Sequence, residues 1–316
     1  MRLKPILALP ALLALSGCNT GDYRLFHPLS QVAQVQWWAT LFELGIMSII
    51  IVPVTVLIAV FIWRYRKSAN AKYDPSWSHS LGLEILVWAV PLVIVIICGI
   101  VSIRTTHAVD PYAPGVLAKA EAAQPPLNID VITTDWQWLF IYPDQHVAAV
   151  DELVVPAGRV VHMRLTSSSV TNDFFIPGVA PMIDVMPGMR TEDTFDAPKP
   201  FTDTGFSADF SGAGFSWMQF ELHVVPPGDF DTWVAKAAAS PRQLTYTAFT
   251  QYARPTINEH ATISYFANPT PQLFESVVGA AQAGVVYPVP DALTTSVASL
   301  EGGPAASSTN NAAATK

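Results

Sequence analysis

The sequence has few cysteines and few charged residues. Only two of its 316 residues are cysteines, Cys18 and Cys98, and they lie in unlike surroundings, so no disulfide framework or zinc motif can be built from them. Charged residues make up 13% of the chain, about half of the roughly 25% typical of a soluble domain. The net charge is −8 and no basic block occurs, which gives a nucleic-acid partner little support. Since 51% of the residues are hydrophobic, the composition indicates an apolar environment around part of the chain.

The sequence also lacks the common catalytic and metal-binding motifs. It contains no Gly-x-Ser-x-Gly, no phosphate-binding loop, no His-Glu-x-x-His and no haem-attachment Cys-x-x-Cys-His. No two histidines have the i,i+4 or His-x-His spacing that favours a shared metal ion. We therefore expect solvated or hydrogen-bonded histidines and no catalytic centre in this chain. The histidines are His27, His79, His107, His146, His162, His223 and His260.

The N-terminus has the features of an export and lipidation signal. Arg2 and Lys4 precede an apolar run, residues 6–15, that is too short to span a bilayer. A Leu-Ser-Gly-Cys box ending at Cys18 then matches the cleavage site of bacterial lipoproteins. We therefore predict that residues 1–17 are a signal peptide and that Cys18 is lipidated, each buried acyl CH₂ adding roughly 0.8 kcal/mol of membrane affinity. The alternative is an ordinary signal peptide with an accidental cysteine.

Two apolar runs, residues 40–63 and 83–103, are long enough to cross a bilayer as helices, since about 20 residues span the roughly 30 Å hydrocarbon core. The loop between them, residues 64–82, carries four basic residues and one acidic residue. The positive-inside rule makes this loop cytoplasmic and puts both chain ends on the far side, as a lipidated N-terminus requires. Each span contains a proline, Pro53 or Pro91, which indicates packing against partner helices that cover the freed carbonyls.

Beyond the second span the sequence changes to strand-like patterns. Several short stretches, such as 127–131 and 218–224, alternate apolar and polar residues and predict a Greek-key sandwich. After Pro226 the pattern favours a helix from Asp229 through Ala239. The Ala-, Ser- and Thr-rich end of the chain cannot bury enough apolar surface to order itself. The predicted order is an exported N-terminal segment at 18–39, a helical hairpin at 40–106, a linker at 107–126, a β domain at 127–226, an aromatic-rich extension at 227–285 and a disordered tail at 286–316.

Residues 207–218 have the length and layout of a copper-binding loop without its copper ligands. A dinuclear copper centre needs two bridging thiolates and two imidazoles, because these donors suit copper. The usual loop is Cys-x-Glu-x-Cys-x3-His-x2-Met, and its upstream histidine belongs to a His-Ser-Phe-x-Val-Pro segment. Here only the methionine is retained, and the upstream segment reads Asn-Asp-Phe-Phe-Ile-Pro from residue 172. The positions of the lost site are Asn172, Ser207, Asp209, Ser211, Phe215 and Met218.

On these residues the sequence resembles subunit II of the haem–copper terminal oxidases, and more narrowly the quinol-oxidising cytochrome o (bo-type) branch, which lacks this copper. The resemblance covers roughly residues 15–285. Further matching segments are Trp136-x-Trp138 with Tyr142-Pro143, Met186-Pro187-Gly188-Met189, residues 72–79 and residues 83–91. The resemblance implies a membrane α+β protein, in which a two-helix transmembrane hairpin is followed by an all-β cupredoxin-like Greek-key domain with a short helical C-terminal extension.

The resemblance also implies a function. The family's complex pumps protons while it oxidises ubiquinol and reduces O₂ to water in the aerobic respiratory chain. This chain would be a non-redox structural subunit without a cofactor, and haems and copper would belong to its partner, subunit I. Further small subunits and membrane lipid would be its other partners. It would lie in the bacterial inner membrane, multi-pass and lipid-anchored, with its C-terminal domain in the periplasm.

Glu84 is the ionisable residue of greatest interest. The resemblance matches it to a subunit II glutamate at the cytoplasmic mouth of the oxidase's lysine-named proton pathway, and intramembrane acids are often functional. The alternative is an acid at a helix N-terminus that the helix dipole stabilises. For Trp136 and Trp138 we expect packing rather than a role in electron transfer, because no copper acceptor is expected behind them.

Two other functions compete with a ubiquinol oxidase subunit. A cytochrome c oxidase subunit II with displaced copper ligands is disfavoured, because Cys18 is assigned to lipid and Cys98 lies within a span. Copper analysis would decide that question. A free-standing membrane lipoprotein with a binding or assembly role is the other candidate, and co-purification with haem would separate it from an oxidase subunit.

Overall fold

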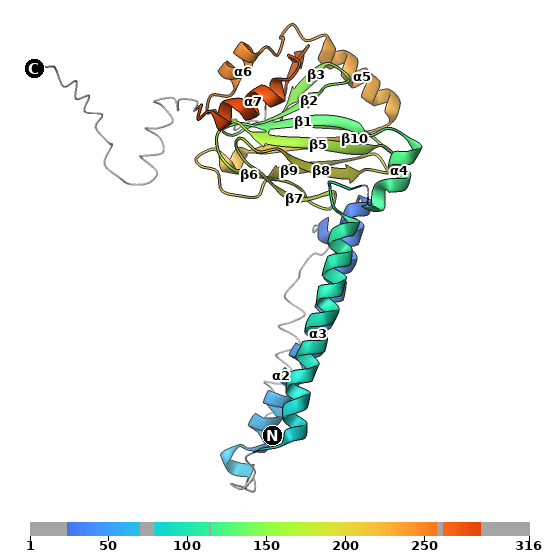
Figure 1. Cartoon of the computed structure of the whole chain (residues 1–316), viewed down its shortest axis with the longest axis vertical. Coiled ribbons are helices and arrows are strands. Elements are labelled where there is room, and N and C mark those ends of the chain that lie inside the picture. Colours follow the sequence, from blue (N-terminus) through green and yellow to red (C-terminus); the bar gives the residue numbers. More distant parts are fainter. Residues whose placement is uncertain (1–23, 70–78, 114, 258–261, 286–316) are drawn as a thin grey trace, which may run out of the picture. The chain divides into compact units, whose positions relative to one another are not determined.

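The computed structural model describes residues 24–69, 79–113, 115–257 and 262–285. They fall into two units that divide after Ala118 (Figure 1). The predicted signal peptide, Cys18, His260, the tail at 286–316 and residues 70–78 of the basic loop lie outside the described residues. The predictions made for those residues stay predictions.

Two long helices make up most of the first unit, α2 (Gln31–Arg64) and α3 (Leu81–Ala108). The two helices contact each other over part of their length. Both begin before and end after the predicted spans, because hydropathy marks only the apolar part of a helix. The Ser30 hydroxyl caps α2 by accepting a hydrogen bond from the Ala33 amide at 2.9 Å. Single 3-10 turns flank the pair at η2 (Arg24–Phe26), η3 (Lys67–Ala69) and η4 (Gly115–Leu117).

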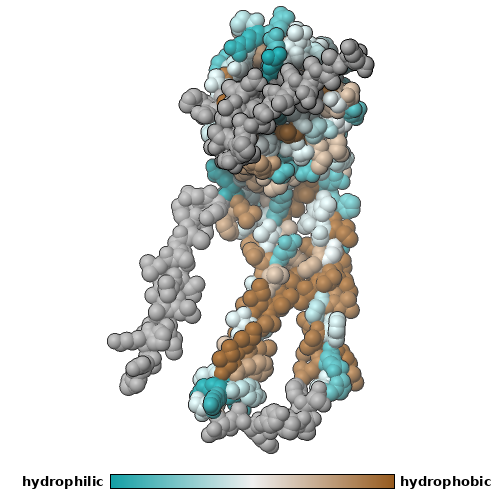
Figure 2. Space-filling view, turned by 90° about the vertical axis from the view of Figure 1, so that its left-hand side faces the viewer, coloured by the Kyte–Doolittle hydropathy of each residue, from teal (hydrophilic) through white to brown (hydrophobic). Residues whose placement is uncertain are grey.

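The side chains of α2 and α3 are apolar on all sides. Both helices are long and apolar enough to cross a membrane, and the most apolar stretch of each is unburied within the chain. Trp88 is 79% exposed and Trp63 68% exposed, and Figure 2 shows hydrophobic side chains over most of the helical surface. A helix that is hydrophobic all round needs a covering of lipid or protein, so this unit depends on its surroundings.

The predicted linker contains helical structure. Beyond α3 and η4 a short helix, α4 (Ala118–Ala123), precedes the first strand. Four of its six residues are alanines, the best helix former, which explains why the prolines around it did not prevent a helix. The Glu121 carboxylate of α4 contacts the His162 ring at 2.8 Å. The expectation of a hydrogen-bonded histidine is met at this position.

The second unit is built on two β-sheets (Figure 1). One has six strands in the order β11-β3-β2-β1-β5-β8 and the other five in the order β4-β10-β9-β6-β7. The pairs β1–β5 and β4–β10 are parallel, and the other pairs are antiparallel. The first sheet comprises β1 (Leu127–Thr133), β2 (Trp138–Tyr142), β3 (Val147–Val150), β5 (Val160–Ser167), β8 (Thr191–Asp196) and β11 (Ser264–Ala267). The second comprises β4 (Glu152–Pro156), β6 (Asn172–Ile176), β7 (Ala180–Val185), β9 (Phe201–Ser207) and β10 (Gln219–Val225).

An aromatic core contributed by both sheets fills the sandwich. The rings of Trp138, Phe174 and Phe220 lie with their centroids 5.3 to 5.4 Å apart, and all three side chains are buried. Phe220 alternates with exposed residues along β10, as the period-two pattern predicts. Gly205 on β9 leaves room for this core, since a Cβ there would meet the Phe220 ring at 2.0 Å. Aromatic contacts at these separations add about 0.5–1.5 kcal/mol each beyond their area burial.

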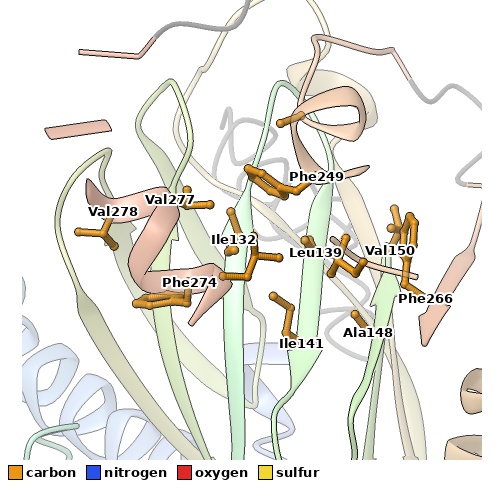
Figure 3. Close-up of a cluster of buried hydrophobic side chains, with 13 residues drawn as sticks. Ile132, Leu139, Ile141, Ala148, Val150, Phe249, Phe266, Phe274, Val277 and Val278 are labelled. Atoms are coloured by element: carbon orange, nitrogen blue, oxygen red, sulfur yellow. The ribbon is translucent and has the colours of Figure 1, made fainter. Parts of the chain in front are cut away.

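A second hydrophobic cluster lies on the other face of the six-stranded sheet (Figure 3). Ile132, Leu139 and Ile141 project from β1 and β2 against side chains of the C-terminal extension. Because both faces of β2 are covered, all five of its residues are buried, which explains its unbroken apolar run. The extension contributes Leu244, Phe249, Ala253, Phe266, Leu273, Phe274, Val277 and Val278 to this cluster.

The C-terminal extension consists of α5 (Pro227–Ala238), α6 (Tyr246–Tyr252), β11 and α7 (Leu273–Gln282). The helix predicted to start at Asp229 begins at Pro227 instead, because proline suits the first helical position. On α5, the Trp233 indole donates to the buried Glu152 carboxylate at 2.8 Å. β11 pairs with β3, so the folded structure continues across the predicted boundary at residue 226.

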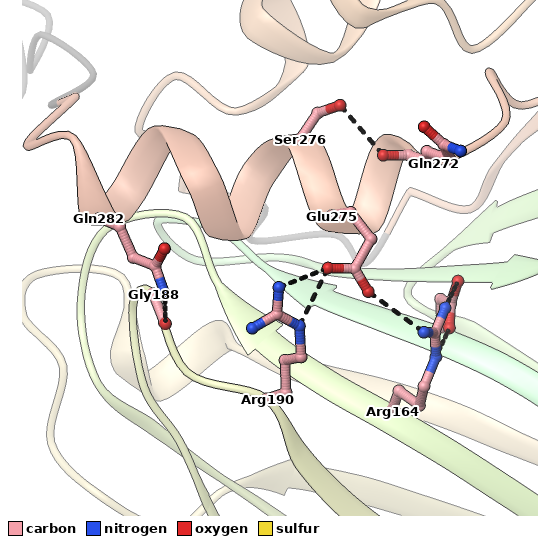
Figure 4. Close-up of polar contacts among 8 residues, drawn as sticks. Arg164, Gly188, Arg190, Gln272, Glu275, Ser276 and Gln282 are labelled. Atoms are coloured by element: carbon pink, nitrogen blue, oxygen red, sulfur yellow. Dashed lines mark hydrogen bonds and ion pairs between the residues drawn. The ribbon is translucent and has the colours of Figure 1, made fainter.

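Ion pairs fix α7 to the sandwich (Figure 4). The Glu275 carboxylate contacts Arg190 at 2.6 Å and Arg164 at 3.3 Å, and Arg190 chiefly lowers the pKa of Glu275. Arg164 also donates two 2.8 Å hydrogen bonds to Asp130 and lies 4.8 Å from the centroid of the Phe274 ring. These contacts join α7 to β1, β5 and the start of β8. The predicted fold class is confirmed: a pair of long apolar helices precedes an all-β sandwich, and short helices follow it.

Candidate functional site

Four of the six positions that the sequence assigned to a lost copper site, Asn172, Ser207, Ser211 and Met218, are joined by contacts at one end of the sandwich. Asn172 begins β6, Ser207 ends the neighbouring β9, and the loop to β10 contains η5 (Phe215–Trp217). The Ser207 hydroxyl lies 3.3 Å from the Asn172 side-chain oxygen, and the Ser211 hydroxyl lies 4.0 Å from the Met218 sulfur. Asn172, Ser207 and Met218 are buried.

The buried amide of Asn172 is held by further hydrogen bonds. Its nitrogen donates to the Thr133 hydroxyl at 3.1 Å and to the Val170 carbonyl at 3.2 Å. The backbone NH of Asp173 donates to the Ser207 hydroxyl at 3.3 Å. Buried polar groups are costly unless they are hydrogen-bonded, and here the side chains at positions 172 and 207 bond to each other and to their neighbours.

The Trp136 indole lies against the loop. Its nitrogen donates to the Ser211 carbonyl at 2.8 Å, and the side chain is buried. Two glycines make this possible, since a Cβ at Gly212 would lie 2.9 Å from the indole and one at Gly214 only 2.3 Å. Trp138 donates from the core to the Met218 carbonyl at 3.4 Å. Both tryptophans therefore pack and hydrogen-bond against the 207–218 loop, as expected for them.

These residues do not fit a dinuclear copper centre. The cluster offers two hydroxyls, an amide and one thioether, whereas copper of this kind needs thiolates and imidazoles. Phe215 packs its ring on Phe210 at 5.6 Å, and Asp209 is exposed. Among the residues that the structure describes, no three His, Cys, Asp or Glu side chains come together as a possible metal site, and the free thiol among them is Cys98 on α3.

Two carboxyl groups that no sequence pattern predicts as a pair lie beside this cluster. Asp173 on β6 pairs across the strands with Asp184 on β7. Burial, and then the neighbouring Asp184 and Asp209, raises the pKa of Asp173 to about 6. Only the strand register brings these acids together, so the sequence alone gave no signal for them.

A third acid, Asp193, lies inside the sandwich. Its side chain is buried on β8 opposite Met163, and burial raises its pKa to about 7. The Thr194 amide donates to one carboxylate oxygen at 2.8 Å. The other oxygen has no hydrogen-bond partner among the described residues. Its sequence context, a polar Thr-Glu-Asp-Thr stretch, predicts a solvated strand instead.

Glu84 lies in the first turn of α3, and its side chain is half exposed. One carboxylate oxygen contacts Nδ1 of His79 at 2.6 Å. A shallow groove on α3 extends from Glu84 along Ile85 and Trp88, and it is otherwise lined by Leu81, Ala89 and Leu92. This end of the helix thus presents a carboxylate beside an apolar surface.

Known proteins with similar sequences are subunits of quinol oxidases. No protein-family model matches the chain. The cytochrome bo(3) ubiquinol oxidase subunit 2 of Pseudomonas putida is 38% identical over 88% of this chain and 85% of that protein. The corresponding subunit of Pseudomonas aeruginosa is 37% identical over 85% of this chain and 78% of its own length. The ubiquinol oxidase subunit 2 of Acetobacter aceti is 37% identical over 76% of each chain.

Among solved structures, the periplasmic domain of subunit II of cytochrome oxidase (CoxB) from Bradyrhizobium japonicum is 27% identical and has a TM-score of 0.33. It matches 35% of this chain and 91% of that one. The sequence relatives, together with two helices of membrane-spanning length, indicate an inner-membrane protein with a periplasmic domain. The chain belongs to the family of cytochrome bo(3) ubiquinol oxidase subunit 2.

Proposed function

We propose that this chain is the non-redox second subunit of a proton-pumping ubiquinol oxidase. Its complex would oxidise ubiquinol, reduce O₂ to water and move protons outward. The observation that carries the non-redox role is the Asn172–Ser207 cluster, where an amide and hydroxyls bond to one another in the place of copper donors. The relatives named as ubiquinol oxidase subunits support the activity of the complex.

The haems and copper of the complex would be bound by subunit I. The exposed apolar surfaces of α2 and α3 support a role as a membrane scaffold, because side chains such as Trp88 and Trp63 need a covering of lipid or partner helices. The prolines inside both helices, Pro53 and Pro91, support partner helices rather than lipid alone. Subunit I and small subunits of the complex would supply those helices.

The complex can be tested by isolation through a tag on this chain. We expect haem absorbance, oxygen uptake driven by ubiquinol and no purple mixed-valence copper absorbance from the full-length chain. Release of the chain without haem in mild detergent would favour the free-standing lipoprotein instead. Two copper atoms bound per chain would overturn the non-redox role.

A lipid anchor on Cys18 is part of the same proposal. The Leu-Ser-Gly-Cys box supports it, and the mature chain would begin at that cysteine. Mass spectrometry of the purified chain should detect a diacylglyceryl group on Cys18 and no residues before it. A mature N-terminus at any other residue would contradict the anchor.

Glu84 would contribute to proton uptake from the cytoplasmic side. Its position in the first turn of α3, half exposed and beside an apolar groove, suits a carboxylate that collects protons from water and passes them to an adjoining subunit. In the purified complex, Glu84→Ala should slow proton uptake during haem reduction while haem content stays normal. Unchanged reduction kinetics would remove Glu84 from the pathway.

A further inference from the structure

We propose that His79 is a positioning residue, which holds the Glu84 carboxylate at the N-terminal end of α3. This inference rests on the proposed role of Glu84 in proton uptake and adds a second residue to that site. The direct observation is the 2.6 Å contact between Nδ1 of His79 and a carboxylate oxygen of Glu84.

The two residues occupy a recurrent pair of positions at the start of a helix. Ser80 is the N-cap of α3, with an extended backbone and no side-chain hydrogen bond to the helix. His79 is therefore the residue before the cap, and Glu84 is the fourth helical residue. Two apolar side chains commonly pack together at these positions and fix the angle at which the chain enters the helix. In this chain an imidazole and a carboxylate make that contact.

The contact determines where the carboxylate lies. Glu84 is the only ionisable side chain among the described residues that line the groove on α3, and the Trp88 indole N–H is the one other side-chain hydrogen-bonding group among them. A glutamate side chain has several rotamers. A carboxylate accepts a proton only when it lies within hydrogen-bond reach of the donor, so most of these rotamers cannot take part in the transfer. The imidazole selects the rotamer that points toward the helix end.

Because the His79–Glu84 pair is exposed, its contribution to the rate of proton uptake should be small but measurable. The side chains of His79 and Glu84 are 63% and 53% exposed. Exposed ion pairs are weak and lose strength in salt, so loss of the contact should change the rate of proton uptake only about two- to fivefold. A loss of that size would leave assembly intact.

Two substitutions of His79 separate positioning from helix capping. His79→Leu keeps an apolar side chain before the cap but removes the donor, whereas His79→Asn keeps an amide nitrogen near the place of Nδ1. In the purified complex we expect His79→Leu to slow proton uptake during haem reduction about two- to fivefold. We expect His79→Asn to restore most of the rate, with the KM for ubiquinol and the haem content unchanged in both. His107→Leu, at the other end of α3, is the matched control and should leave the rate unchanged.

The Glu84→Ala background completes the test. If His79 acts through Glu84, adding His79→Leu to Glu84→Ala should cause no further slowing. A further slowing in the double variant, or equal loss in the Leu and Asn variants, would overturn the positioning role. Normal rates in both His79 variants alongside a slow Glu84→Ala variant would also overturn it but leave the role of Glu84 standing. A normal rate for Glu84→Ala would instead remove the proposed function of that residue.

Discussion

The two units of this chain use large apolar side chains in opposite ways. In the helical unit, Trp88 is 79% exposed and its neighbours along α3 are also uncovered. In the sandwich, Trp138 is 0% exposed and touches two other aromatic rings. The first unit therefore obtains its apolar contacts from lipid and other proteins, whereas the second obtains them from itself. Similar residue types mark an outer surface in one unit and a core in the other.

The largest expected effect comes from opening the aromatic core. Phe220→Ala removes a ring that contacts Trp138, Phe140 and Phe174 and should lower the free energy of unfolding of the sandwich by about 3–5 kcal/mol. Trp88→Ala, which removes an exposed side chain of α3, should change the free energy of unfolding of the sandwich by less than about 0.5 kcal/mol. Denaturant unfolding of the full-length chain in detergent, followed by the near-UV signal of the β unit, measures both. Equal effects would break the contrast between the units.

The next largest effect concerns the buried Asp193. Its pKa is raised to about 7 in the folded chain from an unfolded value near 3.9, so the folded state binds its proton more tightly. Stability should fall as pH rises from about 4 to 7, at up to about 1.4 kcal/mol per pH unit, and level off above 7. Asp193→Asn should lose this part of the pH dependence. If the stability of the original chain and that of Asp193→Asn depended on pH in the same way, burial would not raise the pKa of Asp193.

A smaller loss is expected where Trp136 meets the loop. Gly214→Ala places a methyl group 2.3 Å from the buried indole and should lower the free energy of unfolding by about 1–3 kcal/mol. Gly228→Ala, where a Cβ meets nothing within 4 Å at the start of α5, is the control and should be neutral or slightly stabilising. Denaturant unfolding of the full-length chain in detergent measures both changes. A neutral Gly214→Ala would mean that the loop moves aside freely.

The smallest effect belongs to the ion pairs of α7. Glu275→Gln removes the negative charge that pairs with Arg164 and Arg190, both about half exposed, and should weaken the docking of α7 by about 0.2–1 kcal/mol. Hydrogen exchange should then become faster in α7 but not in α5. The difference should shrink in high salt, because salt screens exposed charges. Unchanged exchange would assign the docking of α7 wholly to Phe274 and its apolar neighbours.

Local patterns in the sequence were sufficient for much of the fold. The apolar runs predicted both long helices, and the alternation in residues 218–224 predicted β10 with its buried face. The family resemblance related Asn172 to the 207–218 loop, and in the structure the Asn172 side chain contacts Ser207. Their history as a copper site stays a prediction, as does the role of Glu84.

What the sequence did not reveal depends on long-range packing. The run Trp138–Tyr142 gives no sign that its two faces meet different clusters. The contact of Glu275 with Arg190 joins positions that only the docking of α7 brings together. Asp193 stands in a polar stretch, and only the register with β5 places it opposite Met163 in the core. Propensity and periodicity do not specify which elements become neighbours.

The pairing of β3 (Val147–Val150) with β11 (Ser264–Ala267) has a consequence for the order of folding. Until the ribosome has supplied β11, β3 ends its sheet with unpaired amides and carbonyls, which readily recruit other chains. The apolar face above it also waits for α6 and α7. A nascent or truncated chain that stops after β10 would therefore be aggregation-prone, although it contains every strand of the smaller sheet.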